Sequence, residues 1–182
     1  SESADSSGRL VSPQDAHLNF GSRWHVLRST AYGNGEGIAH LSLPKNARAD
    51  LRKGWVMHPA LLDLATGWAM KLIPGYDAKG LWVPLSYGEI TVYRCLPAEL
   101  ISWVRLAAGD DDTGFARFDI ALCAPDGTVH ADIKGFQIKK LEGATFARPA
   151  PLTENEVEIE TNEADRPPSA EEDALFHNIR QG

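Results

Sequence analysis

The feature that most constrains this chain is an apolar segment, residues 60–69, that contains one carboxylate, Asp63. Pro59 stands directly before it, and proline is favoured at the first position of a helix because its missing N–H needs no partner there. The apolar pattern predicts a helix over residues 59–73, which a Pro-Gly pair ends. A helix that is apolar on almost every side is buried, so the fold must be built around it.

Asp63 is the residue of this helix that points to chemistry. An unpaired buried charge is costly, so a carboxyl in an apolar helix is paired, neutral or functional. Burial favours the protonated form and raises the pKa of a carboxyl, and a protonated carboxyl can act as a general acid near neutral pH. The alternative is a structural Asp near a helix start, stabilised by the macrodipole. The residue pattern alone leaves both interpretations open.

The rest of the chain predicts an antiparallel sheet. A Gly-Asn-Gly sequence at residues 33–35 is a hairpin signal, because Asn-Gly tolerates the positive φ of a tight turn. About six strands are expected from alternating or β-branched segments, at residues 18–32, 36–43, 81–93, 99–107, 115–123 and 128–141. One buried helix among antiparallel strands predicts an α+β fold, with the sheet packed around the helix.

Four segments of the chain carry motifs in a fixed order. They are Leu18-Asn19-Phe20-Gly21-Ser22-Arg23-Trp24 (a YGPxF-type opening), His58-Pro59-Ala60-Leu61-Leu62-Asp63 (HPxLLD), Val83-Pro84-Leu85-Ser86-Tyr87 (LPFxW-type), and Asp126-Gly127-Thr128-Val129 followed by residues 134–141 (DGxV…GFxLRRL). In this order they resemble the dehydratase domains of modular (type I) polyketide synthases. The resemblance covers residues 18–142.

The resemblance implies a fold and a domain organisation. Such a dehydratase is a double hot dog, in which each half is a long central helix wrapped by an antiparallel sheet, and this chain resembles the C-terminal half. Residues 1–17 are expected to be a linker and residues 18–142 the hot dog. Residues 143–182 are expected to be an acidic, Pro- and Glu-rich linker with a short terminal helix, because periodicity is lost there until a capping-box sequence near the end.

The resemblance also implies an activity. Such domains dehydrate carrier-bound β-hydroxyacyl intermediates to enoyl thioesters, and Asp63 matches the residue that protonates or orients the departing hydroxyl. The α-proton base is a histidine of the other hot dog in an HxxxGxxxxP motif, which this sequence lacks. The chain is therefore expected to supply the acid-bearing half of the site and to be inactive alone. Substrate contacts are expected from His58, Pro59, Leu62 and Gly67.

Gly67 is the main departure from the family pattern. Family members commonly carry Gln or His four residues after the Asp, one helical turn along and on the same face. That side chain helps to hold the carboxyl. Glycine at this position indicates either a degenerate domain that has lost the holder, or a roomier site in which Thr66 or water supplies the hydrogen bond.

Charge and cysteine content limit the partners and cofactors. Residues 151–182 hold nine acids and two bases, and residues 1–150 hold 16 of each, so there is no basic footprint for nucleic acid. Cys95 and Cys123 lack metal-ligand spacing, so no metal is expected. No apolar run is long enough to span a membrane, so we expect a soluble, cytoplasmic protein. The chain starts without Met in a polar, Ser-rich segment, so we expect it to be a fragment of a longer protein.

The resemblance implies no dissociable cofactor, since the substrate arrives on the phosphopantetheine of an acyl carrier protein. The expected partners are this carrier protein, the N-terminal hot dog of the same domain, adjacent polyketide synthase domains and a second copy in a homodimer. Two alternatives stay open: an inactive, structural dehydratase-like domain, and a stand-alone dimeric hot dog acting as an acyl-thioester hydratase or thioesterase.

The five scattered tryptophans are expected to fill the core.

Overall fold

The computed structural model describes residues 10, 12–14, 17–18, 20–107 and 114–141. The chain divides into two compact units, residues 1–148 and 149–182, and the described residues all lie in the first. The expected acidic linker and terminal helix therefore lie outside the described residues.

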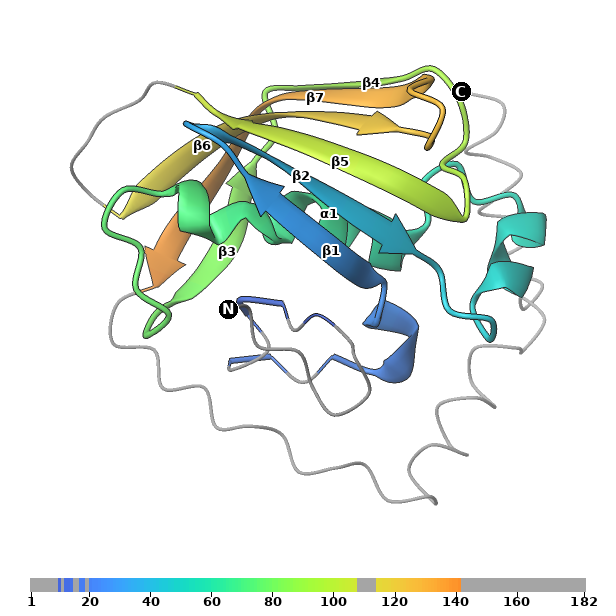
Figure 1. Cartoon of the computed structure of the whole chain (residues 1–182), viewed down its shortest axis with the longest axis horizontal. Helices are drawn as coiled ribbons and strands as arrows, with labels where there is room; N and C mark the ends of the chain where they lie inside the picture. The colour runs from blue at the N-terminus through green and yellow to red at the C-terminus, as the bar shows by residue number, and fades with distance from the viewer. Residues whose placement is uncertain (1–9, 11, 15–16, 19, 108–113, 142–182) are drawn as a thin grey trace, which may run out of the picture. The chain divides into compact units, whose positions relative to one another are not determined.

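The described residues form one seven-stranded antiparallel sheet around a single α-helix, α1 (Pro59–Gly67) (Figure 1). The strands are β1 (Leu27–Tyr32), β2 (Glu36–Ser42), β3 (Leu81–Ser86), β4 (Glu89–Val92), β5 (Glu99–Leu106), β6 (Phe115–Cys123) and β7 (Val129–Leu141). Their order across the sheet is β1-β2-β5-β6-β7-β3, and β4 also pairs with β7. This arrangement confirms the predicted α+β class.

The predicted Gly-Asn-Gly hairpin is confirmed between β1 and β2. Gly35 adopts a φ of 71°, and Tyr32 pairs with Gly37 in the antiparallel ladder. A Cβ on Gly37 would lie 2.8 Å from the Trp68 ring, so glycine there allows the indole to approach the sheet closely. One turn thus sets both the strand pairing and the space for a large core residue.

The segment expected as one strand over residues 81–93 is divided into β3 and β4. Both pair with the long strand β7, one along each half of it. Between them the Gly88 N–H donates to the Lys134 carbonyl at 3.1 Å, and Gly135 adopts a φ of 61°. Two glycines on facing strands therefore allow the sheet edge to break and bend at this point.

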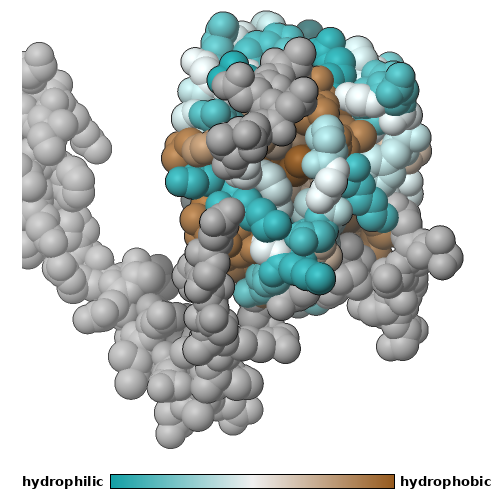
Figure 2. All heavy atoms as spheres, turned by 90° about the vertical axis from the view of Figure 1, so that its left-hand side faces the viewer, coloured by the Kyte–Doolittle hydropathy of each residue, from teal (hydrophilic) through white to brown (hydrophobic). Residues whose placement is uncertain are grey.

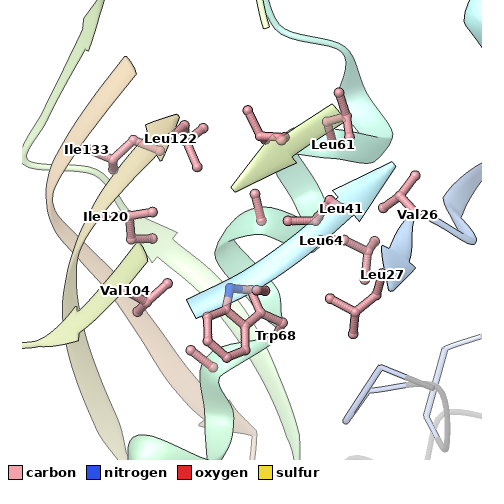
Figure 3. Packing of buried hydrophobic residues seen from close by; sticks show 14 of the residues in the cluster. Val26, Leu27, Leu41, Leu61, Leu64, Trp68, Val104, Ile120, Leu122 and Ile133 are labelled. Carbon is pink, nitrogen blue, oxygen red and sulfur yellow. The ribbon is translucent and has the colours of Figure 1, made fainter. Parts of the chain in front are cut away.

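The core lies between α1 and the inner face of the sheet (Figure 3). Alternate residues of β2 and β5, such as Leu41 and Val104, are buried there together with Leu61 and Leu64 of α1. Trp68 follows the helix and is fully buried, with its indole N–H donating to Ser102 Oγ at 3.1 Å. Since Trp68 has its polar atom paired, it can fill the centre of the core without a desolvation penalty.

The helix is shorter than the sequence predicts. It ends at Gly67, and the expected continuation to residue 73 is the 3-10 helix η3 (Ala69–Leu72). Glycine has a low helix propensity and four-residue 3-10 segments are common at helix ends, which explains the early termination. Two further 3-10 helices, η1 (Ser22–Trp24) and η2 (Arg48–Lys53), precede α1.

The described residues of the expected N-terminal linker are packed rather than free. Ser12 and Gln14 are buried, and the Gln14 Oε1 accepts a hydrogen bond from the Trp82 backbone N–H at 3.0 Å. His17 Nε2 lies 2.9 Å from the Ala78 carbonyl. The packed domain therefore begins before residue 18, where the alternating apolar pattern starts.

Within the described part of the chain, no helix is long and apolar enough to cross a membrane. Figure 2 shows the face at the left of Figure 1, where apolar residues are interspersed with hydrophilic ones. Large apolar side chains are also exposed in β3, β4 and the residues beside them, including Leu85, Tyr87, Ile90 and Tyr93.

Candidate active site

Asp63 lies in the second turn of α1, and a residue of η1 reaches it. The indole Nε1 of Trp24 donates a hydrogen bond to Asp63 Oδ2 at 2.8 Å. Trp24 is half-buried and packs against the edge of the core, while the Asp63 side chain is exposed at the surface of this chain. The sequence places these residues 39 positions apart, and only the packing of η1 on α1 brings them together.

The environment of Asp63 favours its neutral form. Partial desolvation by surrounding atoms raises the pKa of the carboxyl above its usual value, and the Trp24 hydrogen bond lowers it in part. The direction agrees with the sequence prediction, but the sequence also predicted a buried carboxyl, whereas the Asp63 side chain is exposed. The inner positions belong to Leu61, Leu64 and Ala65, which leaves Asp63 accessible from outside.

Tyr87 is a further side chain near Asp63. Tyr87 follows β3 and stacks on Phe136, with ring centroids 4.8 Å apart. Burial raises the pKa of the Tyr87 phenol, the Thr66 hydroxyl lowers it as a hydrogen-bonding partner, and the Asp63 carboxylate raises it again. A neutral phenol and a carboxyl of raised pKa therefore lie in one region of the surface.

The space beside Gly67 is open. A Cβ built on Gly67 would meet nothing within 4 Å. The Thr66 hydroxyl, which was one candidate holder of the carboxyl, instead donates to helix carbonyls, that of Leu62 at 3.0 Å and that of Asp63 at 3.2 Å. The hydrogen bond to the carboxyl comes from Trp24 and not from Thr66, which the sequence left open as one candidate beside water.

A second carboxylate, Asp50 of η2, lies at the start of α1 in a contrasting environment. It is nearly buried and forms an ion pair with Arg23, and Lys53 Nζ lies 3.3 Å from its Oδ1. His58 Nε2 lies 3.4 Å from Oδ2, while His58 Nδ1 is buried without a partner among the described residues. The Arg23 guanidinium above all, opposed by burial and assisted by Lys53 and His58, lowers the pKa of Asp50 to about 2.

The structure places the predicted substrate-contact residues on different sides of α1. His58 precedes the helix and is buried against Asp50, which makes it a structural link between η2 and α1. Pro59 is exposed at the first helical position, Leu62 is half-buried against the core, and Gly67 is partly exposed at the helix end. Substrate contact by any of them stays a prediction.

Sequence reasoning missed Trp24, Tyr87 and Asp50. Trp24 and Tyr87 end two of the motif segments, and an aromatic residue with a polar group at the end of a motif was the available signal. The tryptophans were all expected to fill the core, which holds for Trp68 and Trp82 but not for Trp55 and Trp103, which are 47% and 37% exposed. Nothing in the local pattern distinguishes Asp50 from an exposed acid.

The described residues include potential metal ligands and thiols. In this described part of the chain, no group of three or more His, Cys, Asp or Glu side chains is placed to hold a metal ion. Cys95 is exposed and Cys123 half-buried, and both are free thiols.

Comparisons with known proteins agree on one family. The family model described as "Polyketide synthase dehydratase N-terminal domain" matches residues 6–148. Polyketide synthase PksM of Bacillus subtilis is 23% identical over 146 residues, which is 77% of this chain and 3% of PksM. PksN of the same organism is 26% identical over 125 residues, which is 69% of this chain and 2% of PksN.

Solved dehydratase domains have the same fold. The RzxB dehydratase domain of Pseudomonas fluorescens has a TM-score of 0.59 at 25% identity, covering 66% of this chain and 42% of that one. A trans-AT dehydratase domain of Brevibacillus brevis has a TM-score of 0.60 at 25% identity, covering 68% and 43%. The dehydratase domain of the CurF module has a TM-score of 0.61 at 22% identity, covering 68% and 42%. These likenesses confirm the hot-dog fold, and the chain spans less than half of each of these three solved chains.

Proposed function

This chain belongs to the polyketide synthase dehydratase family, and we propose from that premise that it forms the acid-bearing half of a dehydratase site. The substrate would be a β-hydroxyacyl chain carried as a thioester on the phosphopantetheine of an acyl carrier protein. The family model is described as an N-terminal domain, whereas the motif order favours the C-terminal half, so the choice of half is part of this proposal.

The single observation that carries the proposal is the state of Asp63. Its carboxyl is accessible and has a raised pKa, and it is oriented by Trp24 at the start of α1. A protonated carboxyl can give its proton to the β-hydroxyl as the C–O bond breaks, so that water leaves. The electrons of the α C–H bond form the new double bond, and a base must take the α-proton.

The base would come from a second hot dog. Among the described residues, no histidine hydrogen-bonds to Asp63, and the buried His58 faces Asp50. The solved dehydratase domains are more than twice as long as the part this chain matches, which leaves room for such a half. The exposed Leu85 and Tyr87, beside the site, are apolar surface for it to cover.

The test is dehydration by the complete dehydratase domain that contains this chain and its other half. The substrate is a β-hydroxyacyl thioester on the carrier protein, and the product is followed as the enoyl thioester. We expect Asp63→Asn to reduce turnover by about 10²- to 10⁴-fold, the range of a general acid, with little change in stability because Asn has the same shape. Asp126→Asn in the exposed β6–β7 turn is the matched control, since Asn can still accept the Thr128 N–H that Asp126 accepts.

Equal turnover by Asp63→Asn and wild type would make Asp63 structural and overturn the assignment. Wild type without turnover on any β-hydroxyacyl carrier substrate would favour the inactive, structural domain. The chain alone, without its other half, should show no dehydration. Turnover by a dimer of this chain alone, measured with sedimentation on the same sample, would favour the stand-alone hydratase.

A further inference from the structure

The support of Asp63 comes from outside its own helix. Among the described residues, Trp24 is the side chain that hydrogen-bonds to this carboxyl, with Nε1 2.8 Å from Oδ2. On α1 itself, Gly67 has no side chain, and the Thr66 hydroxyl is engaged with helix carbonyls. The helix therefore offers no side chain one turn along to orient the acid.

Trp24 is itself held firmly. It ends η1, where its N–H donates to the Gly21 carbonyl at 2.9 Å and its carbonyl accepts from the Val26 N–H at 2.8 Å. The preceding residue, Arg23, is ion-paired with Asp50. Because Asp50 also contacts His58 at the start of α1, this ion pair ties η1 to the helix that carries Asp63.

We propose that Trp24 is a positioning residue, which holds the Asp63 carboxyl in place of the side chain that is missing at position 67. The proposal rests on the proposed function of Asp63 as the acid. An indole N–H can only donate, so it bonds Oδ2 in both protonation states of the carboxyl and leaves the acidic proton on Oδ1. A neutral donor also orients the acid without the full charge that would keep it ionised.

The other titratable group near Asp63 in the described structure is Tyr87, which packs from the sheet side and whose raised pKa keeps it neutral at ordinary pH. Arg23, the cation adjacent to Trp24 in sequence, is paired with Asp50. The pKa of Asp63 should therefore respond mainly to its desolvation and to the indole donor.

The test measures the pKa of Asp63 directly, by carbon-detected NMR titration of its carboxyl in this chain, and needs no turnover. Trp24→Phe keeps the ring but removes the donor, so the ionised form loses a hydrogen bond and the pKa rises. We expect the acid dissociation constant to fall about threefold to tenfold. Trp103→Phe is the matched control: its Nε1 donates to Glu36 Oε2 at 2.9 Å, so the same change is made at a distant carboxylate and Asp63 should not respond.

A rescue experiment distinguishes a positioning role of Trp24 from a role in packing alone. In the Trp24→Phe background, Gly67→Gln places an amide donor one helical turn from Asp63, in open space. We expect it to return the pKa toward the wild-type value, while Gly67→Ala in that background does not. In the complete dehydratase domain, Trp24→Phe should lower kcat more than it raises KM, and Gly67→Gln should recover kcat.

An unchanged Asp63 pKa in Trp24→Phe, or an equal change in Trp103→Phe, overturns the proposal. If Trp24→Phe does not fold, the wild-type chain still decides: the Trp24 indole proton must shift through the pKa of Asp63, and that titration must vanish in Asp63→Asn. An indole proton that does not titrate overturns the proposal too. A shifted pKa in Trp24→Phe together with full turnover by Asp63→Asn would reject the acid role while keeping Trp24 as the holder.

Discussion

Asp50 of η2 and Asp63 of α1 lie in opposite environments, although side chains of the same short segment, η1, contact both. Arg23 and Trp24 are neighbours in η1, and one reaches Asp50 while the other reaches Asp63. Asp50 receives a guanidinium and a second cation, Lys53, and its pKa falls to about 2. Asp63 receives a neutral indole donor and partial desolvation, and its pKa rises.

The contrast teaches that cationic partners outweigh desolvation at Asp50, whereas a neutral donor does not at Asp63. Asp50 is the more buried of the two carboxylates, yet it is the one that stays ionised, because cations compensate its desolvation. At Asp63, partial desolvation raises the pKa of the carboxyl, and the neutral Trp24 donor lowers it only in part. We infer that Asp50 ties elements together, and that Asp63 is the carboxyl available for proton transfer.

The largest expected effect on the pKa of Asp63 comes from placing a cationic side chain beside it. Gly67→Lys places an ammonium one turn along in open space, which favours the ionised carboxyl. The pKa of Asp63 should fall by about one to three pH units, measured by NMR titration. Turnover of the complete domain should fall with it, since less of the acid is protonated at neutral pH. A pKa that stays raised would break the comparison, since desolvation would then dominate whatever the partner.

A smaller effect is expected from removing the charge of Asp50. Its folded pKa of about 2 lies below the unfolded value of about 3.9. The ionised form therefore stabilises the fold fully above the unfolded pKa, and this contribution is lost as the pH falls toward about 2. Asp50→Asn should lower the free energy of unfolding at pH 7, and the difference from wild type should shrink over that acidic window.

Denaturant unfolding of both proteins from pH 7 to pH 2 measures this difference. Asp77→Asn is the control, because Asp77 pairs with Lys140 at 3.0 Å on the exposed surface, where an ion pair contributes little. A difference between wild type and Asp50→Asn that is independent of pH would mean that Asp50 acts through packing rather than charge.

The smallest effect is expected from Gly67→Ala. Alanine is favoured over glycine in a helix by about 0.5 to 1 kcal/mol, and a Cβ at this position has free space. The free energy of unfolding should rise by up to that amount, while the pKa of Asp63 stays unchanged because a methyl group neither donates nor carries charge. A pKa that moves as far as in Gly67→Lys would show that filling the space, and not the cation, controls the acid.

The local pattern of the sequence determined much of the fold. Alternation located most of the strands, although β1 begins at Leu27 rather than at residue 18 and the segment 81–93 is divided into β3 and β4. The Asn-Gly pair located the β1–β2 hairpin, and Pro59 located the helix start. These features depend on neighbours within a few residues, so they can be read along the chain. The same pattern singled out Asp63, because a carboxylate within an apolar helix is conspicuous.

Only the tertiary structure decided what surrounds that carboxylate. The packing of η1 on α1 brings Trp24 to Asp63 and Arg23 to Asp50, and the break between β3 and β4 leaves Tyr87 beside the acid. Such contacts join residues tens of positions apart, and periodicity carries no information about them. The exposure of the Asp63 side chain was likewise decided by the tertiary structure. The sequence indicated that α1 is apolar on almost every side, but only the position of the sheet decided that Asp63 faces outward.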